Sequence, residues 1–450
     1  MRVVLVSTYD LGRQPFGLAS PAAWLRQAGH EVHMLDLAVG DVDEACVRGA
    51  DVVAFHLPMH TATCLAIAMV PWLRQLNPTA RLCFFGLYAP VNESLLRRLG
   101  ADAILGGEFE RELLEFVEAP GPAGVPRAPR VVTSHERLAF RAPDRSGLPP
   151  LDRYARLRLP GGESRVVGAT EASRGCKHRC RHCPIVPVYD GRFRIVPAEV
   201  VLEDVRRQVE AGAGHITFGD PDFWNGIGHA LPLIERLHAE HPELTYDVTI
   251  KVEHLLRHRE HLTTLRRTGC LFVTSAVESL DDGVLRRLDK GHTREDFLAV
   301  VEAFRAHGLT LSPTFVPFTP WTTPAAYRDL LGTLDRLGMS ASVSPVQLAI
   351  RLLIPAGSRL LELDDVRELA GALDESSLVH PWRHPDPAID ALQEQVFRVV
   401  ADGAAAQAPR ETVFGSVARL AGVPAAVHTD PVAARLRLTP VPYLTEPWYC

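Results

Sequence analysis

Short apolar runs alternate with amphipathic segments along the first part of the chain. Apolar runs rich in β-branched residues predict strands, and apolar residues three or four positions apart predict helices. The expected strands are 3–6, 31–37, 52–57, 81–85 and 103–105, and the expected helices are 19–28, 42–48, 62–76, 93–99 and 110–117. Strands that alternate with helices are typical of a parallel sheet in a doubly wound, Rossmann-like fold. We therefore expect an α/β domain over residues 1–118.

The same alternation returns in the middle of the chain, over residues 165–357. The expected strands are 166–172, 215–218, 246–251, 271–277, 310–316 and 342–348, and the expected helices are 197–210, 229–239, 259–267, 294–306 and 325–337. Six strand–helix units predict a second α/β domain. In β/α barrels the active site lies at the C-terminal ends of the strands, so polar residues at these ends are candidates for function.

Proline-rich stretches separate and follow these two regions. Seven prolines fall within residues 119–164, namely Pro120, Pro122, Pro126, Pro129, Pro143, Pro149 and Pro150. This density excludes a regular helix or central strand, so we expect an extended linker with one short strand at 130–133. Residues 358–450 form the fourth segment, a helical C-terminal extension with expected helices 363–373, 388–400 and 411–420. We expect these helices to cap the open side of the central domain or to cover the substrate.

Composition narrows the class of protein. The chain has 450 residues, of which 46% are apolar and 23% charged, as in a globular protein with more than one domain. A net charge of −6 gives no general attraction to nucleic acid or to an anionic membrane. The longest apolar stretch, 64–73, is far shorter than the roughly 20 residues that a bilayer span needs, and the N-terminus turns polar too early for a signal peptide. We expect a cytoplasmic protein whose eight cysteines are reduced.

A cysteine motif carries the strongest chemical signal. Cys176, Cys180 and Cys183 have the spacing C-x₃-C-x₂-C. Thiolates are soft ligands, and three close together suit an iron–sulfur cluster or zinc. A [4Fe–4S] cluster normally takes four cysteines, so three would leave one iron open for chemistry. The alternative is a structural zinc site that adds His178, His182 or a distant histidine.

The motif resembles that of the radical S-adenosylmethionine (SAM) superfamily. The resemblance implies a partial (β/α)₆ barrel over 165–357 and a [4Fe–4S] cluster bound by Cys176, Cys180 and Cys183. It also implies that SAM chelates the fourth iron and that an electron from a donor such as flavodoxin or ferredoxin splits SAM to a 5′-deoxyadenosyl radical. His182, which precedes the third cysteine, is expected near the adenine.

The resemblance extends to the second and fourth strand ends. Gly219, Asp220 and Asp222 stand where the family usually has Gly-Gly-Glu, and they would bind the SAM ammonium. Asn225, a little further on, is expected to form a turn. Glu278 and Ser279 resemble the family's Glu-Ser, which meets the SAM ribose and carboxylate, and a Lys-Gly-His-Thr sequence follows at 290–293.

Polar residues at the third and sixth strand ends are further candidates for SAM or substrate contacts. Period two places Lys251 on one face with Thr249 and Glu253, where it would bind SAM or substrate or form a salt bridge with Glu253. Gln347 and Arg351 interrupt an apolar run. Arg351 would hold a carboxylate or phosphate, or form an internal ion pair.

The N-terminal domain resembles the cobalamin-binding domain that precedes the barrel in many radical SAM enzymes. Glycines mark its strand ends, at Gly17, Gly86, Gly106 and Gly107. The Asp-x-His-x-x-Gly signature is absent, so cobalamin would bind without a histidine from loop 9–17. A degenerate domain that only supports the barrel or a substrate is the alternative. Methylthiotransferases carry three N-terminal cysteines for a second cluster, but Cys46, Cys64 and Cys83 fall on separate elements here and are expected to be buried thiols.

These observations predict a radical SAM enzyme that acts on an unidentified small molecule or peptide. The reaction would be cobalamin-dependent methyl transfer to an unactivated carbon, or a radical rearrangement or oxidation without cobalamin. A zinc-stabilised binding protein is the rival from another class. The barrel also resembles a radical SAM family whose tail ends in Cys-Cys-Ala-Glu-Pro or Cys-selenocysteine-Ala-Glu-Pro. Cys450 would then be the first cysteine of that tail, and a UGA codon would follow it.

Overall fold

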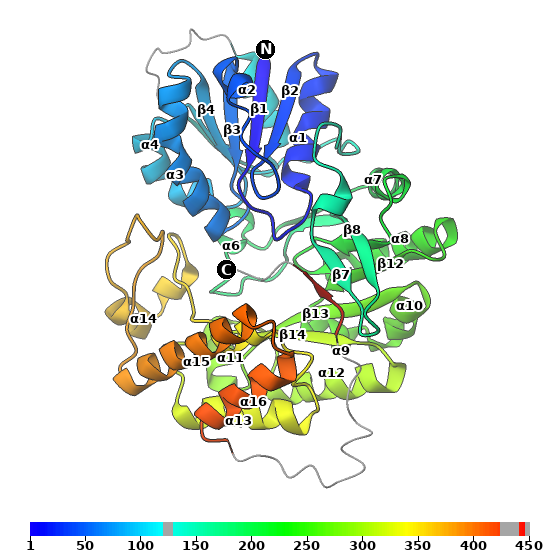
Figure 1. The fold of residues 1–450 in the computed structure, drawn as a ribbon, viewed down its shortest axis with the longest axis vertical. Coiled ribbons are helices and arrows are strands. Elements are labelled where there is room, and N and C mark those ends of the chain that lie inside the picture. Colours follow the sequence, from blue (N-terminus) through cyan, green and yellow to red (C-terminus); the bar gives the residue numbers. More distant parts are fainter. Residues whose placement is uncertain (120–128, 424–440, 446–450) are drawn as a thin grey trace.

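The computed structural model describes residues 1–119, 129–423 and 441–445 (Figure 1). A parallel sheet with the order β2-β1-β3-β4-β5-β6 forms the N-terminal part. Its strands are β1 Arg2–Ser7, β2 Glu31–Asp36, β3 Val52–His56, β4 Arg81–Phe85, β5 Ala103–Gly107 and β6 Arg130–Ser134. The first five strands were predicted within a residue or two. The short strand expected in the linker is β6, which pairs with β5 and extends this sheet to Ser134.

Helices cover both faces of this sheet, which confirms the doubly wound fold. They are α1 Phe16–Gln27, α2 Glu44–Arg48, α3 His60–Leu76, α4 Glu93–Arg98 and α5 Glu110–Glu118. Apolar side chains of α1 and α5 pack in one core layer, and those of α2, α3 and α4 pack in another. Cys46 and Cys83 lie in different layers and are buried, while Cys64 is half-buried. The three cysteines thus lie on separate elements, and Cys46 and Cys83 are the buried thiols that the sequence predicted.

A second sheet, with the order β14-β13-β12-β11-β8-β7-β15, curls into a half-barrel. Its strands are β7 Arg156–Arg158, β8 Ser164–Thr170, β11 His215–Phe218, β12 Thr245–Thr249, β13 Cys270–Glu278, β14 Leu311–Phe315 and β15 Tyr443–Leu444. The strands from β8 to β14 are parallel, whereas β7 and β15 add an antiparallel edge. The helices around it include α7 Ala198–Glu210, α8 Ile227–Glu240, α10 Leu262–Arg267, α12 Arg294–His307 and α13 Pro324–Arg336.

Two local predictions in this half-barrel are wrong. Residues 342–348 were expected to form the sixth strand, but Pro345–Leu348 is a 3₁₀ helix, η5. Proline cannot donate a ladder hydrogen bond and is rare in central strands, and the sixth position is reduced to one parallel bridge between Phe318 and Arg351. The third strand was expected to reach Lys251, but it ends at Thr249 and helix α9 begins at Val252.

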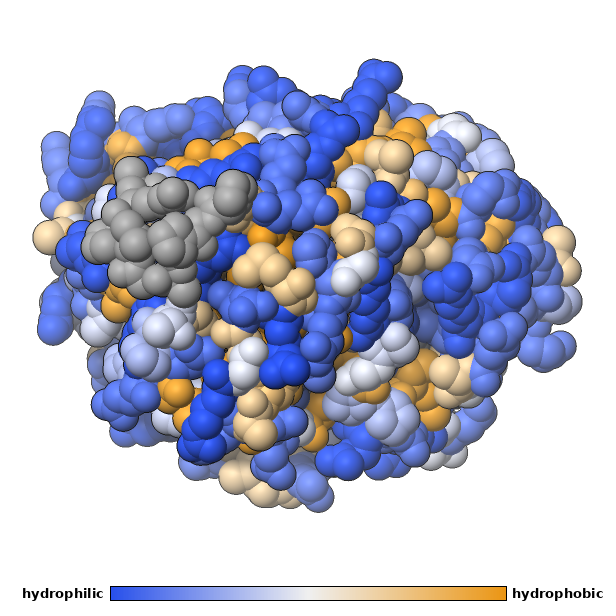
Figure 2. Space-filling view, turned by 90° about the horizontal axis from the view of Figure 1, so that it is seen from above, coloured by the Kyte–Doolittle hydropathy of each residue, from blue (hydrophilic) through white to orange (hydrophobic). Residues whose placement is uncertain are grey.

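The C-terminal helices cover the half-barrel edge where the sixth strand was expected. They are α14 Asp364–Leu369, α15 Pro387–Ala405 and α16 Arg410–Leu420. Helices α15 and α16 contact η5, and α16 also contacts α13 (Figure 1). Within the described residues, no helix has the length and apolar character needed to cross a membrane. On the face shown in Figure 2, apolar residues lie scattered among hydrophilic ones. Cys450 lies outside the described residues.

Candidate functional site

The cysteine loop, residues 176–183, begins directly after β9 (Ser173–Gly175), a short strand that follows β8 and pairs antiparallel with β10 (Phe193–Ile195). Cys176 and Cys180 are buried, Cys183 is half-buried, and all three are free thiols. Burial raises the pKa of Cys183 to about 12, and the nearby Cys180 and Cys176 add to this effect. Thiols packed this closely can ionise together only if a cation joins them. The three residues therefore fit a metal cluster.

Positive and polar groups surround these thiols. Lys251 Nζ lies 3.9 Å from Cys180 Sγ. Asn225, which was expected to serve only as a turn former, is buried, and its Oδ1 accepts a hydrogen bond from the backbone N–H of Lys177 at 3.3 Å. The same oxygen lies 3.9 Å from Cys176 Sγ. Groups of this kind around the sulfur atoms tune the charge and the reduction potential of an iron–sulfur cluster.

Glu278 faces the loop from the end of β13. It lies beyond a register shift in the pairing with β14, and its φ of +66° is in the left-handed region. Bulges and strained residues of this kind re-aim side chains at functional sites. Glu278 Oε1 lies 3.1 Å from His182 Nε2 and 3.2 Å from Lys290 Nζ. Burial alone would raise the pKa of Glu278, but Lys290 and His182 outweigh it and lower the pKa to about 2.

The residues that follow β11 are also beside the cysteine loop. Asp220 is buried and accepts hydrogen bonds from the Ala172 N–H at 2.9 Å and from Ser173 Oγ at 2.6 Å. Burial raises its pKa to about 7, although these bonds lower it. Gly219 lines the cavity between the N-terminal sheet and the half-barrel. Asp222 is fully buried and turned toward His254 and His178, so its predicted contact with SAM stays a prediction.

The remaining predicted residues are engaged with other parts of the protein. Gln347 Oε1 accepts the Phe315 N–H at 2.9 Å. Arg351 pairs with Asp390 at 2.6 Å, which is the internal ion pair that the sequence left open.

Two further candidates make contacts within the protein, and their predicted contacts with SAM stay predictions. Ser279 Oγ, at the end of β13, accepts the Asp281 N–H at 3.0 Å. Lys251 Nζ lies 3.9 Å from Glu253 Oε2, so the expected salt bridge coexists with its approach to Cys180.

A cavity of about 290 Å³ separates the N-terminal sheet from the half-barrel. Its walls come from the C-terminal strand ends on one side, including His56, and from the segment around Arg174 on the other. Gly86 and Gly107 line it with φ of +110° and +67°, and a Cβ on Gly107 would lie 2.1 Å from the Ser134 oxygen. These glycines are therefore required by the turns of the chain itself. The position is nevertheless the one where doubly wound folds bind ligands.

Sequence reasoning missed three residues of this region. Lys290 was seen only as part of a motif, although it balances the charge of Glu278. His178 was considered only as a zinc ligand with the cysteines, and His254 was not considered. The side chains of His178 and His254 approach each other only through the fold, with ring centroids 4.9 Å apart.

Comparison with protein families decides the class. Residues 170–329 match the family described as "Radical SAM superfamily". The chain carries a radical SAM domain. This domain implies a [4Fe–4S] cluster and SAM as cofactors and places the chain among enzymes that need a reductant. The predicted resemblance to this superfamily is confirmed.

Curated relatives are similar over part of their length. The hopanoid C-3 methylase of Methylococcus capsulatus is 25% identical over 331 residues, which cover 68% of this chain and 62% of the relative. The tRNA-2-methylthio-N(6)-dimethylallyladenosine synthase of Moorella thermoacetica is 26% identical, over 49% of this chain and 54% of the relative. The chain thus spans less than two thirds of the length of the curated relatives it matches.

Solved structures show the same fold. OxsB, a cobalamin-dependent SAM radical enzyme solved with aqua-cobalamin and SAM bound, has a TM-score of 0.69 at 15% identity, over 89% of this chain and 66% of OxsB. The radical SAM methyltransferase TsrM from Kitasatospora setae, solved with cobalamin and a [4Fe–4S] cluster, has a TM-score of 0.57 at 18% identity, over 74% of this chain and 73% of TsrM. The radical SAM domain therefore lies within the fold of the cobalamin-dependent radical SAM enzymes.

Proposed function

We propose that this chain is a radical SAM enzyme whose [4Fe–4S] cluster is held by Cys176, Cys180 and Cys183. The observation that supports it best is the packing of three free thiols in one loop, with Lys251 Nζ 3.9 Å from Cys180 Sγ. A cluster held by three cysteines keeps one iron free, and when bound it supplies the electron that cleaves SAM.

The residues around the loop suit the groups of SAM. His182 precedes the third cysteine, and its pairing with Glu278 fixes the orientation of its ring beside the thiols. Glu278 is ionised at neutral pH because Lys290 and His182 lower its pKa, so it can accept hydrogen bonds from SAM hydroxyls or from its ammonium. Gly219 and Asp220 lie after β11, and we propose that they bind the SAM ammonium.

The test is whether SAM binds to the cluster. The full chain is reconstituted anaerobically with iron and sulfide, reduced, and examined by electron paramagnetic resonance with and without SAM. We expect the spectrum of the reduced cluster to change when SAM is added, because SAM ligates the open iron. Protein that carries zinc and gives no iron–sulfur signal would support the binding-protein alternative. A cluster whose spectrum ignores SAM would contradict the proposal.

Cobalamin-dependent methyl transfer is the finer candidate. It is supported by the position of the cavity, between the N-terminal strand ends and the segment that leads into the cysteine loop. The cavity volume of about 290 Å³ is close to the lower end of the range for small-molecule sites, and we derive no step through cobalamin. S-Adenosylhomocysteine that forms only when cobalamin is added would support this candidate, whereas cobalamin without effect would favour rearrangement or oxidation.

A further inference from the structure

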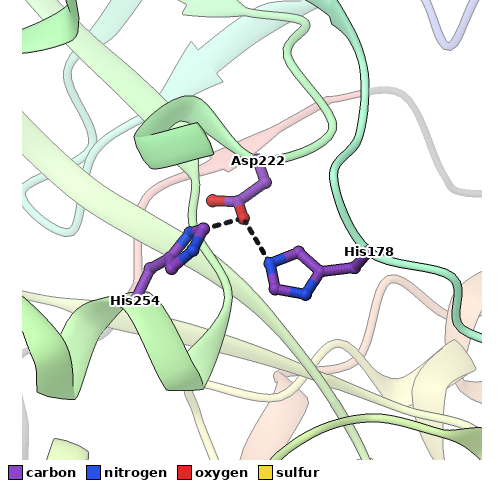
Figure 3. A group of neighbouring side chains, drawn as sticks. All are labelled: His178, Asp222 and His254. Atoms are coloured by element: carbon purple, nitrogen blue, oxygen red, sulfur yellow. Dashed lines mark ion pairs between the residues drawn. The ribbon is translucent and has the colours of Figure 1, made fainter. Parts of the chain in front are cut away.

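A second group of metal-binding side chains lies beside the cysteine loop. His178 comes from the loop itself, Asp222 from the turn after β11, and His254 from the first turn of α9 (Val252–Arg257). We call these residues the histidine–aspartate cluster. One atom from each, His178 Nε2, Asp222 Oδ2 and His254 Nδ1, lies within 4.8 Å of the others. Figure 3 shows the carboxylate of Asp222 between the two imidazole rings.

The three inward atoms are buried and unsatisfied. Asp222 has no exposed surface, and 5% of His254 is exposed. Asp222 Oδ2 lies 2.7 Å from His254 Nδ1 and 3.7 Å from His178 Nε2. Neither contact has the geometry of a hydrogen bond, and within the described part of the chain none of the three atoms has a hydrogen-bond partner. A buried polar atom without a hydrogen-bond partner is costly, so three such atoms at one point, joined only by these two ionic contacts, favour a ligand between them.

The far sides of two of these residues are held in place. Asp222 Oδ1 is oriented by the backbone N–H groups of Trp224 at 3.3 Å and Lys251 at 3.4 Å. His178 Nδ1 lies 3.6 Å from Glu253 Oε2. A carboxylate behind a histidine is the usual outer partner of a metal-binding imidazole, because it fixes the ring and leaves the other nitrogen free for the metal.

An ion pair alone does not account for this arrangement. A pair between Asp222 and His254 would satisfy those two residues after a small rotation. It would leave His178 Nε2 buried without a partner, 3.7 Å from an oxygen already in use. A cation at the centre satisfies all three atoms together.

We propose that the histidine–aspartate cluster binds one divalent transition-metal cation of the zinc type. Two imidazole nitrogens and one carboxylate oxygen form a ligand set that zinc commonly takes in proteins, whereas an iron–sulfur cluster takes thiolates. Three protein ligands leave one position for water. The ion joins the cysteine loop to the ends of β11 and β12, and so it fixes the backbone on both sides of His178, between Cys176 and Cys180.

The test measures zinc and iron in the same preparation. The full chain is reconstituted anaerobically, supplied with Zn²⁺, passed through a desalting column and analysed by mass spectrometry of its metals. We expect one zinc per chain beside the iron of the cluster. His178→Ala and His254→Ala should lose this zinc and keep their iron. His258→Ala is the matched control, because its ring lies 6.1 Å from that of His254 and outside the cluster, so it should keep both metals.

X-ray absorption at the zinc edge of the wild-type protein gives a readout that does not depend on whether the variants fold. The proposal predicts only nitrogen and oxygen neighbours, at about 2.0–2.2 Å. Sulfur neighbours at about 2.3 Å would place zinc on the cysteines and overturn the proposal. A wild-type chain that retains no zinc, or His178→Ala and His254→Ala variants that retain it fully, would also overturn it. Because iron is counted separately, failure of this site is distinguishable from failure of the [4Fe–4S] assignment.

Discussion

Lys251 is the residue that most directly links charge to the reduction potential at the candidate site. Its ammonium lies 3.9 Å from Cys180 Sγ and is buried. A positive charge at this distance stabilises the reduced cluster, which carries one more negative charge than the oxidised one. The sequence placed Lys251 among the candidates, but as a group that would contact SAM or the substrate or form a salt bridge with Glu253.

Replacing Lys251 with methionine should therefore make the cluster harder to reduce. We expect the midpoint potential of Lys251→Met to fall by roughly 50–100 mV, which corresponds to about 1–2 kcal/mol for one electron. A redox titration followed by electron paramagnetic resonance measures the shift. Lys177→Met is the matched control, because the Lys177 ammonium lies over the Phe193 ring, 4.7 Å from its centroid. Equal potentials in the two variants would contradict the role of Lys251.

Glu278 shows what a sequence motif can and cannot predict about one residue. The Glu-Ser motif identified it correctly as a polar residue at a strand end. Its φ of +66° and the register shift beside it follow from pairing between β13 and β14, and no local pattern encodes them. Its partner Lys290 lies on the loop after α11 (Asp282–Leu288), so the pair forms only in the folded chain.

At the scale of the elements, η5 replaces the expected sixth strand as a hydrogen-bond partner of β14. Gln347 Oε1 accepts the buried N–H of Phe315, which a neighbouring strand would otherwise bind. Pro345 disfavours a strand at this position, but the apolar residues around it are typical of one. The sequence pattern therefore predicted a strand. Lys251 was predicted to lie in a strand because the apolar residues within 246–252 do not show where β12 ends and where α9 begins.

Gln347→Leu tests this structural role. The variant leaves the Phe315 N–H without a partner, so we expect the free energy of unfolding to fall by about 1–3 kcal/mol. We expect the Michaelis constant for SAM to stay unchanged, because the side chain is directed at the backbone of β14. Denaturant unfolding and SAM kinetics measure the two effects. Gln75→Leu, on the exposed face of α3, is the control for stability. A raised Michaelis constant with unaltered stability would instead support the predicted contact with SAM.

At the scale of the molecule, the buried Arg174 and the half-buried Arg145 join the N-terminal domain to the half-barrel. Arg174, on β9, pairs with Glu110 at 2.7 Å and with Glu108 at 3.4 Å, both beside the end of β5. Arg145, in the linker, binds Asp204 of α7 through two nitrogens at 2.8 and 2.9 Å and binds Gln14 Oε1 at 2.9 Å. The N-terminal part thus supports the strand from which the cysteine loop begins.

Loss of the Arg145 side chain should destabilise the whole protein. Asp204 is 1% exposed, and removal of its partner leaves a buried carboxylate uncompensated, which costs about 3–5 kcal/mol. We expect Arg145→Ala to unfold at lower denaturant concentration. We also expect faster amide hydrogen exchange around Gln14 and around Ala169, whose carbonyl oxygen accepts a hydrogen bond from Arg145 at 2.6 Å. Arg236→Ala is the control, because Arg236 makes an exposed pair with Glu199 at 2.8 Å, and exposed ion pairs contribute little to stability. Equal decreases in the free energy of unfolding for Arg145→Ala and Arg236→Ala would contradict a special role for the linker.

The order of elements along the chain predicted both α/β parts of the molecule, because parallel sheets require long, regular alternation. The cysteine loop was predicted for a similar reason, since its ligands are close together in sequence. The cavity and the histidine–aspartate cluster were not predicted. Both are formed by segments that are distant in sequence and meet only where the two parts pack together or where β11, β12 and the cysteine loop converge.

The central claim is that Cys176, Cys180 and Cys183 hold a cluster that cleaves SAM. The most direct test quantifies 5′-deoxyadenosine from anaerobically reconstituted, chemically reduced protein and SAM, for the wild-type chain and for Cys180→Ala. The account predicts that the wild type, with about four irons per chain, forms 5′-deoxyadenosine and that Cys180→Ala forms none. A wild-type protein with its full iron content and no nucleoside product, or a Cys180→Ala variant with undiminished product, would contradict it.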